Sequence, residues 1–227
     1  MVPDGDIVLV HGLWHQPAHF NQLAALLRQR GFTVHAPHLH RGSLLEDTCA
    51  VQRVVDSCSS VPIVVGHSYG GSVITGLTGV DHLVFVAAFV PAEGESSASL
   101  GGPVALVNSA VTKHVDGTTS VRPELAIPAL YGKCTPADAE IARSLLVSQR
   151  PGHGRGIPER FSWRTTPSTY VICDHDHAID PLLQERLASR CTRTVRLPSD
   201  HSPFISQPKQ LADIISSSAT TADEDVR

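Results

Sequence analysis

Residues 61–71 read Val-Pro-Ile-Val-Val-Gly-His-Ser-Tyr-Gly-Gly, and this stretch decides the fold class. Its first half is a short apolar run that ends at glycine, which is typical of a strand buried on both faces. Its second half, Gly66 to Gly70, matches the pattern Gly-x-Ser-x-Gly and leads into an apolar, helix-like segment. Such a sharp strand-to-helix turn strains the serine backbone and exposes its hydroxyl, while the small flanking residues avoid collisions. We therefore predict that Ser68 is a nucleophile; the alternative is an ordinary serine in a glycine-rich turn.

Apolar runs alternate with segments of helical periodicity on both sides of this turn. The expected strands cover residues 7–10, 33–36, 61–65, 83–89, 169–173 and 194–197. The expected helices cover residues 17–30, 44–58, 70–77, 181–190 and 208–216. Alternation of this kind predicts a parallel sheet with crossover helices on its faces. We expect an α/β fold with about six mainly parallel strands flanked by helices.

The alternation breaks between residues 91 and 167, where Gly, Pro and Ser are frequent and one clear helix is expected at 136–149. We interpret this block as a small cap that is inserted after the fourth strand and has no core of its own. The expected organisation is a single domain with its core at about 5–90 and 168–216. The small, polar and acidic residues 217–227 are expected to form a flexible tail.

Composition narrows the class of protein. The chain has 227 residues, of which 41% are hydrophobic and 18% charged, and this excludes a disordered or fibrous chain. A net charge of −4 gives no bulk attraction to nucleic acid or to an anionic membrane. Five scattered cysteines, no signal-peptide pattern and no membrane-length apolar run lead us to expect a cytoplasmic protein. No cofactor motif is visible, so the expected partner is a small-molecule substrate, and a homodimer stays open.

A serine hydroxyl needs a base to remove its proton, and the base needs a carboxylate to orient it. After this kind of turn the chain order is serine, acid, histidine. Among the late histidines, His201 directly follows the last strand and precedes the last helix, so we predict that it is the base. We expect His153, His175 and His177 to be exposed loop histidines.

Three aspartates compete for the role of the acid after the strand at 169–173. Asp174 lies close to the end of that strand, and Asp180 precedes a proline, which is typical of a helix N-cap. Asp176 remains as the predicted acid, with a solvated loop charge as the alternative. The neighbouring pair His175 and His177 suggests a metal site, but consecutive side chains rarely converge on one ion without a distant third ligand, so no metal is expected.

An oxyanion hole requires backbone N–H groups, and we expect them from Tyr69 and from Leu13 in the loop after the first strand. Seven residues are expected to form the substrate pocket: Gly12, Trp14, His15, Phe89, Tyr131, Trp163 and Phe204. Gly12 would permit close backbone approach, and plain core packing is the alternative for Trp14. Of the 13 histidines, we expect His11, His15 and His67 to shape the site without proton transfer and the other nine besides His201 to be surface or cap residues.

The chain resembles the α/β-hydrolase superfamily from Ile7 to about Ile215. The matching segments are residues 11–12, 66–71, 131–138, 167–173, 176–179 and 201–204. It looks most like the small single-domain esterases related to the plant hydroxynitrile lyase and methylesterase group, with the first two strands of the full sheet missing. The resemblance implies a Ser68–His201–Asp176 triad and hydrolysis of carboxylic esters.

The resemblance also tests other activities. Relatives that cleave cyanohydrins usually carry Thr and Lys at the positions of Gly12 and Ser202, so that reaction is disfavoured, and a dehalogenase would carry Asp at the position of Ser68. The aromatic, weakly charged pocket favours a small-to-medium apolar ester or lactone. Two alternatives remain open: a non-hydrolytic lyase or cyclase, and a ligand receptor that retains the triad.

Overall fold

The computed structural model describes residues 5–39, 42–101 and 106–218. Its main sheet has six strands in the order β2-β1-β3-β4-β7-β8, and each neighbouring pair is parallel. The strands are β1 (Asp6–Val10), β2 (Thr33–His35), β3 (Ile63–His67), β4 (His82–Val86), β7 (Ser168–Cys173) and β8 (Arg193–Leu197). The predicted six-stranded parallel sheet is therefore confirmed.

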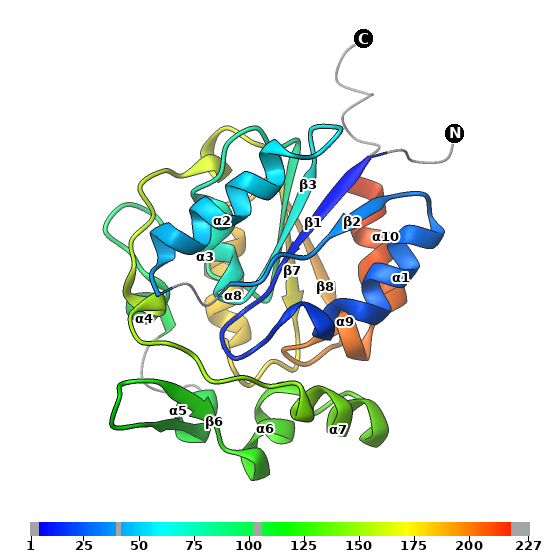
Figure 1. The fold of residues 1–227 in the computed structure, drawn as a ribbon. Helices are drawn as coiled ribbons and strands as arrows, with labels where there is room; N and C mark the ends of the chain where they lie inside the picture. Colours follow the sequence, from blue (N-terminus) through cyan, green and yellow to red (C-terminus); the bar gives the residue numbers. More distant parts are fainter. Residues whose placement is uncertain (1–4, 40–41, 102–105, 219–227) are drawn as a thin grey trace.

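Helices cover both faces of this sheet (Figure 1). One face carries α2 (Leu44–Asp56), α3 (Gly70–Thr75) and α8 (Pro181–Ala188), and the other carries α1 (Asn21–Gln29) and α10 (Pro208–Ser218). Successive strand residues point to opposite faces, so Val8 joins the core cluster beneath α2 and α3 while Leu9 joins the cluster beneath α1 and α10. Because both faces are buried, the strands read as continuous apolar runs rather than as alternating patterns.

Capping residues set several helix boundaries. The Ser43 side chain accepts a hydrogen bond from the Glu46 N–H at the start of α2, and Asp180 accepts one from the Leu182 N–H at the start of α8. The segment predicted as one helix at 17–30 divides into a 3-10 turn, η1 (Pro17–Phe20), and α1. Helix α10 ends at Ser218, two residues later than expected, and residues 219–227 of the predicted tail lie outside the described residues.

Residues 106–144 of the segment between β4 and β7 lie beyond the carboxyl ends of the strands (Figure 1). The last part of the segment returns past the end of α3, where Ser162 donates to the Ile74 and Thr75 carbonyls, to the start of β7. The whole segment contains α4 (Ser97–Gly101), α5 (Leu106–Ala110), β5 (Val111–Lys113), β6 (Thr119–Val121), α6 (Pro123–Leu130), α7 (Pro136–Ser144), η2 (His153–Arg155) and η3 (Ser162–Arg164). The helix predicted at 136–149 is shorter than expected, because Gln149 pairs with Thr119 as a β-bridge. This segment also has a small apolar cluster made mainly of alanines and centred on Tyr131, although no core was expected there.

Hydrogen bonds join this cap to the loop that follows β1. The Val147 N–H donates to the Trp14 carbonyl at 2.9 Å, and the Trp14 indole N–H donates to Thr119 Oγ1 at 3.0 Å. The Gln16 side-chain amide donates to the Leu145 carbonyl at 2.7 Å. The cap is therefore fixed to the loop that was predicted to supply an oxyanion donor.

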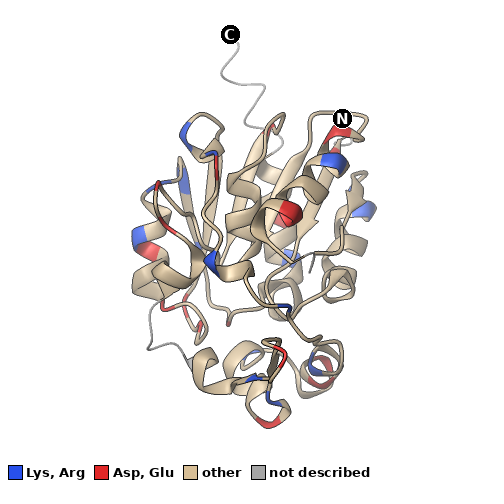
Figure 2. Ribbon diagram, turned by 60° about the vertical axis from the view of Figure 1, so that its left-hand side comes forward, with Lys and Arg blue, Asp and Glu red and all other residues tan. Residues whose placement is uncertain are grey.

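Charged residues of both signs are scattered along the ribbon rather than gathered by sign (Figure 2). No helix in the described part of the chain is both long enough and apolar enough to cross a membrane.

Candidate active site

Ser68 lies in the sharp turn between β3 and α3 with a φ of +54°. This left-handed conformation is strained for any residue with a side chain, as the sequence pattern predicted. The glycines around the turn leave no room for a side chain. A Cβ on Gly66 would lie 2.8 Å from the Gly70 carbonyl oxygen, and one on Gly71 would collide with the Phe89 carbonyl. The turn thus exposes Ser68 because its neighbours pack backbone against backbone.

His201 and Asp176 form a buried pair at the carboxyl ends of β8 and β7. Nδ1 of His201 donates a hydrogen bond to Oδ2 of Asp176 at 2.8 Å, and both residues are almost fully buried. Oδ1 of Asp176 accepts from the backbone N–H groups of Ala178 and Ile179 at 2.7 and 3.0 Å. The carboxylate is therefore held in one orientation, which in turn fixes the imidazole ring.

The two competing aspartates have other partners. Asp174 pairs with Arg196 at the surface at 2.6 Å, and Asp180 caps α8 as predicted. Of the three, the structure brings only Asp176 to His201.

Gln184 on α8 is part of this arrangement, and sequence reasoning missed it. Its side-chain amide donates to Asp176 Oδ2 at 2.8 Å and to the Ile179 carbonyl at 2.8 Å. Its oxygen accepts from the Cys173 N–H at 3.0 Å. Gln184 has no exposed surface, and its hydrogen bonds hold the Asp176 carboxylate and the loop that carries it. The sequence signal that could have identified Gln184 is a polar residue on the inner face of the helix expected at 181–190.

His67, directly before Ser68, holds the backbone of His201. Its Nε2 lies 2.9 Å from the His201 carbonyl oxygen, so Nε2 carries the proton and donates it. Burial, followed by the nearby His201, lowers the pKa of His67 well below its usual value, and the ring stays neutral. This supports the expectation that His67 shapes the site without transferring protons.

The loop after β1 presents the peptide group that joins Gly12 to Leu13. The Leu39 N–H donates to Nε2 of His11, so Nδ1 of His11 carries the proton and donates it to the Gly12 carbonyl at 2.9 Å. That bond fixes the peptide whose N–H belongs to Leu13. In the described part of the chain, neither the Leu13 N–H nor the Tyr69 N–H is used by another protein group. A Cβ on Gly12 would lie 2.8 Å from Cβ of Ser68, so this loop closely approaches the turn that carries Ser68, as predicted.

A second buried network anchors Tyr69. Its hydroxyl donates to Oδ2 of Asp47 on α2 at 2.9 Å. The same oxygen lies 3.4 Å from Nε2 of His153, whose Nδ1 donates to the Arg150 carbonyl at 2.9 Å. Burial and the neighbouring Asp47 raise the pKa of Tyr69, so its hydroxyl keeps its proton. The hydrogen bond to Asp47 ties Tyr69 to α2. His153, whose Nε2 accepts from the Gly42 N–H at 3.2 Å, packs edge-on against the Tyr69 ring.

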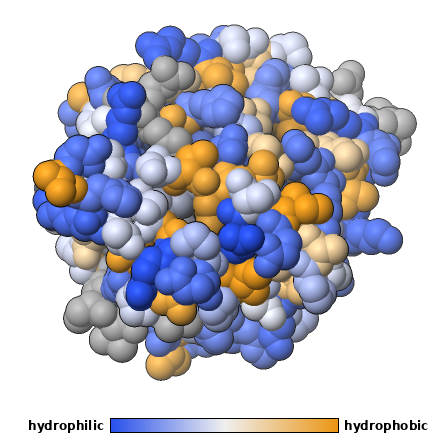
Figure 3. All heavy atoms as spheres, turned by 60° about the horizontal axis from the view of Figure 1, so that its bottom comes forward, coloured by the Kyte–Doolittle hydropathy of each residue, from blue (hydrophilic) through white to orange (hydrophobic). Residues whose placement is uncertain are grey.

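Ser68 and His201 both line a cavity of about 270 Å³. Its other lining residues are Leu13, Trp14, His15, Phe89, Ser97, Ala98, Gly101, Val107, Asn108, Leu130, Gly154, Ala178 and Ile179. None of these described residues is Lys, Arg, Asp or Glu, so the cavity suits an uncharged group. Figure 3 turns the cap end of the molecule toward the reader and shows hydrophobic side chains near the centre of that face, among hydrophilic ones.

Four predicted pocket residues lie elsewhere. Trp163 packs on the core under α2 and α3 and donates its indole N–H to the Pro91 carbonyl at 3.1 Å. Phe204 packs between the rings of Phe20 and His67, and Gly12 lies beneath Ser68 rather than in the cavity wall.

Tyr131 is the fourth of these residues, and it has no exposed surface. It acts on the cavity through His15, because its hydroxyl donates to Nε2 of that ring at 3.0 Å. His15 in turn donates from Nδ1 to the Leu13 carbonyl at 2.9 Å, and burial lowers its pKa well below the usual value. Trp14, His15 and Phe89 line the cavity as expected.

The prediction that the remaining histidines are exposed is wrong for three of them. His19, His82 and His153 are 4%, 6% and 1% exposed. Each can be buried because a ring nitrogen has a hydrogen-bond partner, such as Thr169 Oγ1 for His82 and the Ala142 carbonyl for His19. His175 and His177 are exposed as predicted, and His40 lies outside the described residues.

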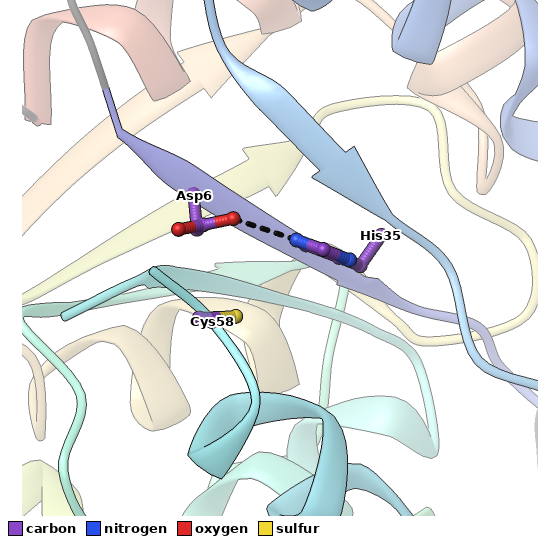
Figure 4. Close-up of side chains that lie close together, drawn as sticks. All are labelled: Asp6, His35 and Cys58. Carbon is purple, nitrogen blue, oxygen red and sulfur yellow. Dashed lines mark hydrogen bonds and ion pairs between the residues drawn. The ribbon is translucent and has the colours of Figure 1, made fainter. Parts of the chain in front are cut away.

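One group of three potential metal ligands occurs among the described residues, far from this cavity: Asp6, His35 and Cys58 (Figure 4). Asp6 Oδ1 pairs with Nε2 of His35 at 2.7 Å. Its Oδ2 accepts from the Ser59 hydroxyl at 2.8 Å and from the Ser60 N–H at 2.9 Å, while the Cys58 thiol donates to the Val54 carbonyl. Protein donors therefore occupy both carboxylate oxygens of Asp6, and they lower its pKa despite its burial. We interpret this group as a set of hydrogen bonds that joins β1 to β2 and to the turn before β3.

Comparison with known proteins agrees with this architecture. The model of the alpha/beta hydrolase family matches residues 7–214. The alpha/beta hydrolase nvfD of Aspergillus novofumigatus is 26% identical, covering 96% of this chain and 98% of the relative. The carbendazim hydrolyzing esterase of a Nocardioides species is also 26% identical, covering 92% and 97%. The crystal structure of a pyrethroid hydrolase from Sphingobium faniae superposes with a TM-score of 0.82 at 22% identity, covering 97% of this chain and all of that one.

A strained serine after a central parallel strand, lining the same cavity as the histidine of a buried histidine–carboxylate pair, is typical of α/β-hydrolases. The chain belongs to the alpha/beta hydrolase family.

Proposed function

We propose that this protein is a serine hydrolase that cleaves a small-to-medium apolar carboxylic ester or lactone. The observation that carries the proposal is the buried His201–Asp176 pair, whose imidazole lines the same uncharged cavity as the strained Ser68. The pair is oriented before any substrate binds, and preorganisation of this kind lowers the barrier to proton transfer.

In the acylation step, Oγ of Ser68 attacks the carbonyl carbon of the ester while Nε2 of His201 removes the hydroxyl proton. Asp176 stabilises the imidazolium that forms. The carbonyl oxygen becomes an oxyanion, to which the Leu13 and Tyr69 N–H groups donate hydrogen bonds. The bond to the leaving alcohol then breaks, the alcohol takes the proton from His201, and the acyl group stays on Ser68.

In the deacylation step, His201 removes a proton from water, and the resulting hydroxide attacks the acyl carbon. The proton returns to Oγ of Ser68 as the ester bond to the enzyme breaks and the carboxylic acid leaves. With a lactone the alcohol and acid belong to one molecule, so the product is a hydroxy acid. No cofactor takes part in either step.

The substrate class follows from the cavity. Among the described residues the lining is mainly aliphatic and aromatic and includes no Lys, Arg, Asp or Glu, which favours an uncharged substrate held mainly by apolar contact. A volume of about 270 Å³ limits the bound part to a small or medium group. The names of two relatives, a carbendazim hydrolyzing esterase and a pyrethroid hydrolase, support hydrolytic chemistry of this general kind.

The test compares wild type with Ser68→Ala on short-chain p-nitrophenyl esters, together with labelling by a fluorophosphonate. We expect turnover and a covalent adduct at Ser68 in wild type, and neither in the variant. Wild type that shows no turnover and no adduct would contradict the proposal. Tight binding of a small ligand that is unaffected by Ser68→Ala would favour a receptor instead.

A further inference from the structure

The carboxylate of Asp200, directly before His201, joins two separate parts of the molecule. Asp200 is 4% exposed and lies in the loop between β8 and α9 (Pro203–Ser206). One of its oxygens is used within that loop, and the other reaches the cap. Neither sequence reasoning nor the proposed chemistry assigns this residue a role.

Oδ1 of Asp200 closes the loop that carries the base. It accepts from the Ser202 N–H at 3.0 Å and from the Ser206 hydroxyl at 3.1 Å, and the Ser199 hydroxyl lies at 3.3 Å. These donors flank His201 on both sides along the chain. This one oxygen therefore holds the backbone on both sides of His201.

Oδ2 of Asp200 holds the turn between α6 and α7. It accepts from the Lys133 N–H at 2.8 Å, and the Cys134 thiol lies at 3.6 Å. Burial and the adjacent carboxylate raise the pKa of the Cys134 thiol, so the sulfur keeps its proton and can donate. The cap is thus bound to the base loop through a backbone donor and a side-chain donor next to each other in the chain.

The turn held by Oδ2 also leads to the cavity. Tyr131, two residues before Lys133, donates its hydroxyl to His15, which lines the cavity beside Ser68 and His201. On the opposite side, the His201 carbonyl accepts the hydrogen bond from His67 at 2.9 Å. The base loop is therefore fixed at two points, to the nucleophile turn by His67 and to the cap by Asp200.

We propose that Asp200 is a positioning residue that aligns His201 by locking the base loop to the α6–α7 turn of the cap. The inference deepens the proposed function and rests on it, because the alignment matters only if His201 transfers protons. A buried carboxylate needs most of its lone pairs satisfied, so Asp200 is stable only when the cap turn and the base loop are both in place. The position of the α6–α7 turn and the orientation of His201 are then coupled through Asp200.

The principal variant is Asp200→Asn. It keeps the volume and one acceptor oxygen, but its NH2 group cannot accept a hydrogen bond. The donors on one side, either Lys133 and Cys134 or Ser202 and Ser206, therefore lose their acceptor. We expect kcat on a p-nitrophenyl ester to fall about 10- to 100-fold while KM changes less than about 3-fold, because misalignment affects proton transfer rather than binding. The rate of Ser68 labelling by a fluorophosphonate should fall by a similar factor.

Two further variants separate positioning from folding. Ser206→Ala removes only one donor to Oδ1, and we expect a 2- to 5-fold lower kcat at unchanged KM even if the Asn variant folds poorly. Asp174→Asn is the matched control, since it alters an aspartate of the neighbouring loop that pairs with Arg196 at the surface, and its kcat should equal that of wild type. Assays are run well below the melting temperature of each variant.

A structural readout keeps this inference distinct from the proposed function. The Nδ1 proton of His201 should give a low-field NMR signal in wild type, because it is held between His201 and Asp176, and the signal should broaden or move in Asp200→Asn. Should wild type hydrolyse no ester, the proposed function fails while this signal still tests Asp200. The inference would be overturned if Asp200→Asn folds and keeps the wild-type kcat, labelling rate and His201 signal. If Asp200→Asn does not fold, a wild-type kcat in Ser206→Ala would overturn it.

Discussion

The side-chain amide of Gln184 donates a hydrogen bond of 2.8 Å to Oδ2 of Asp176, the oxygen that also accepts from Nδ1 of His201. One carboxylate oxygen thus receives two side-chain donors, and the glutamine decides where that oxygen lies. Because Gln184 also binds the two ends of the loop that carries Asp176, its contribution to stability and its contribution to the site have the same origin.

Replacing Gln184 by leucine should therefore lower both stability and activity. The Cys173 N–H and the Ile179 carbonyl would lose their buried partner, and each such loss costs about 1–3 kcal/mol. We expect the free energy of unfolding in urea to fall by about 2–4 kcal/mol and kcat to fall about 10-fold. Gln29→Leu, on the exposed side of α1, should change neither value. Equal unfolding curves for wild type and Gln184→Leu would contradict this reading.

Gly12→Ala should reduce activity without preventing folding. A Cβ at this position would lie 2.8 Å from Cβ of Ser68 and 3.1 Å from Nδ1 of His67, so the loop after β1 must move away from Ser68. A misplacement of about 1 Å at reacting groups can lower the rate about 100-fold. We expect kcat to fall by about that factor. Gly5→Ala, whose Cβ would have 3.8 Å to its nearest neighbour, should keep wild-type kinetics.

The order of strands and of reactive residues could be predicted from the sequence because both follow from local patterns. Buried strands give continuous apolar runs, and Gly66 and Gly70 mark the turn around Ser68 by their spacing alone. The order serine, acid, histidine then pointed to Asp176 and His201, and the structure brings these two into contact.

Residues that act through distant partners could not be predicted in this way. Asp200 binds Lys133 across 67 positions of the chain, and Asp47 binds Tyr69 from a different helix. Nothing local to Asp200 or Asp47 distinguishes it from a surface aspartate. The same limit explains Trp163, which was expected in the pocket for its size and aromaticity but packs on the core instead.

The cap was less predictable than the sheet for a different reason. Helix α6 contains Pro128, which breaks the usual helical pattern, and β5 and β6 have only three residues each. Elements this short or interrupted carry too few residues for a periodicity to emerge. They form because the apolar cluster around Tyr131 packs them together.

Tyr69→Phe tests the buried hydrogen bond between Tyr69 and Asp47, beside Ser68. The substitution removes the hydroxyl that donates to Asp47 and leaves the Tyr69 backbone N–H in place. We expect the free energy of unfolding to fall by about 1–3 kcal/mol, since a buried acceptor loses a donor. In a double-mutant cycle with Asp47→Asn, the coupling energy should exceed about 0.5 kcal/mol. Additive effects of the two substitutions would show that the hydroxyl and the carboxylate stabilise the fold separately.

Stability should fall as the pH drops below neutrality, and His82 is one cause. Burial, followed by the nearby Arg193, lowers the pKa of His82 from 6.5 to about 4. Above pH 6.5 the ring is neutral in both the folded and the unfolded state, so its contribution is fully present. Between pH 6.5 and 4 the unfolded state binds the proton first, and each such histidine reduces stability by at most about 1.4 kcal/mol per pH unit. The lowered pKa values of His15 and His67 act in the same direction.

Urea unfolding at a series of pH values between 7 and 5 measures this slope directly. His82→Gln keeps a polar group that can reach Thr169 Oγ1 but cannot titrate, so its stability should depend less steeply on pH than that of wild type. The exposed His175 provides the matched control, and His175→Gln should keep the wild-type slope. If His82→Gln and wild type lose stability in parallel over this range, the folded protein must accommodate a protonated His82, and burial and Arg193 would not keep the ring neutral.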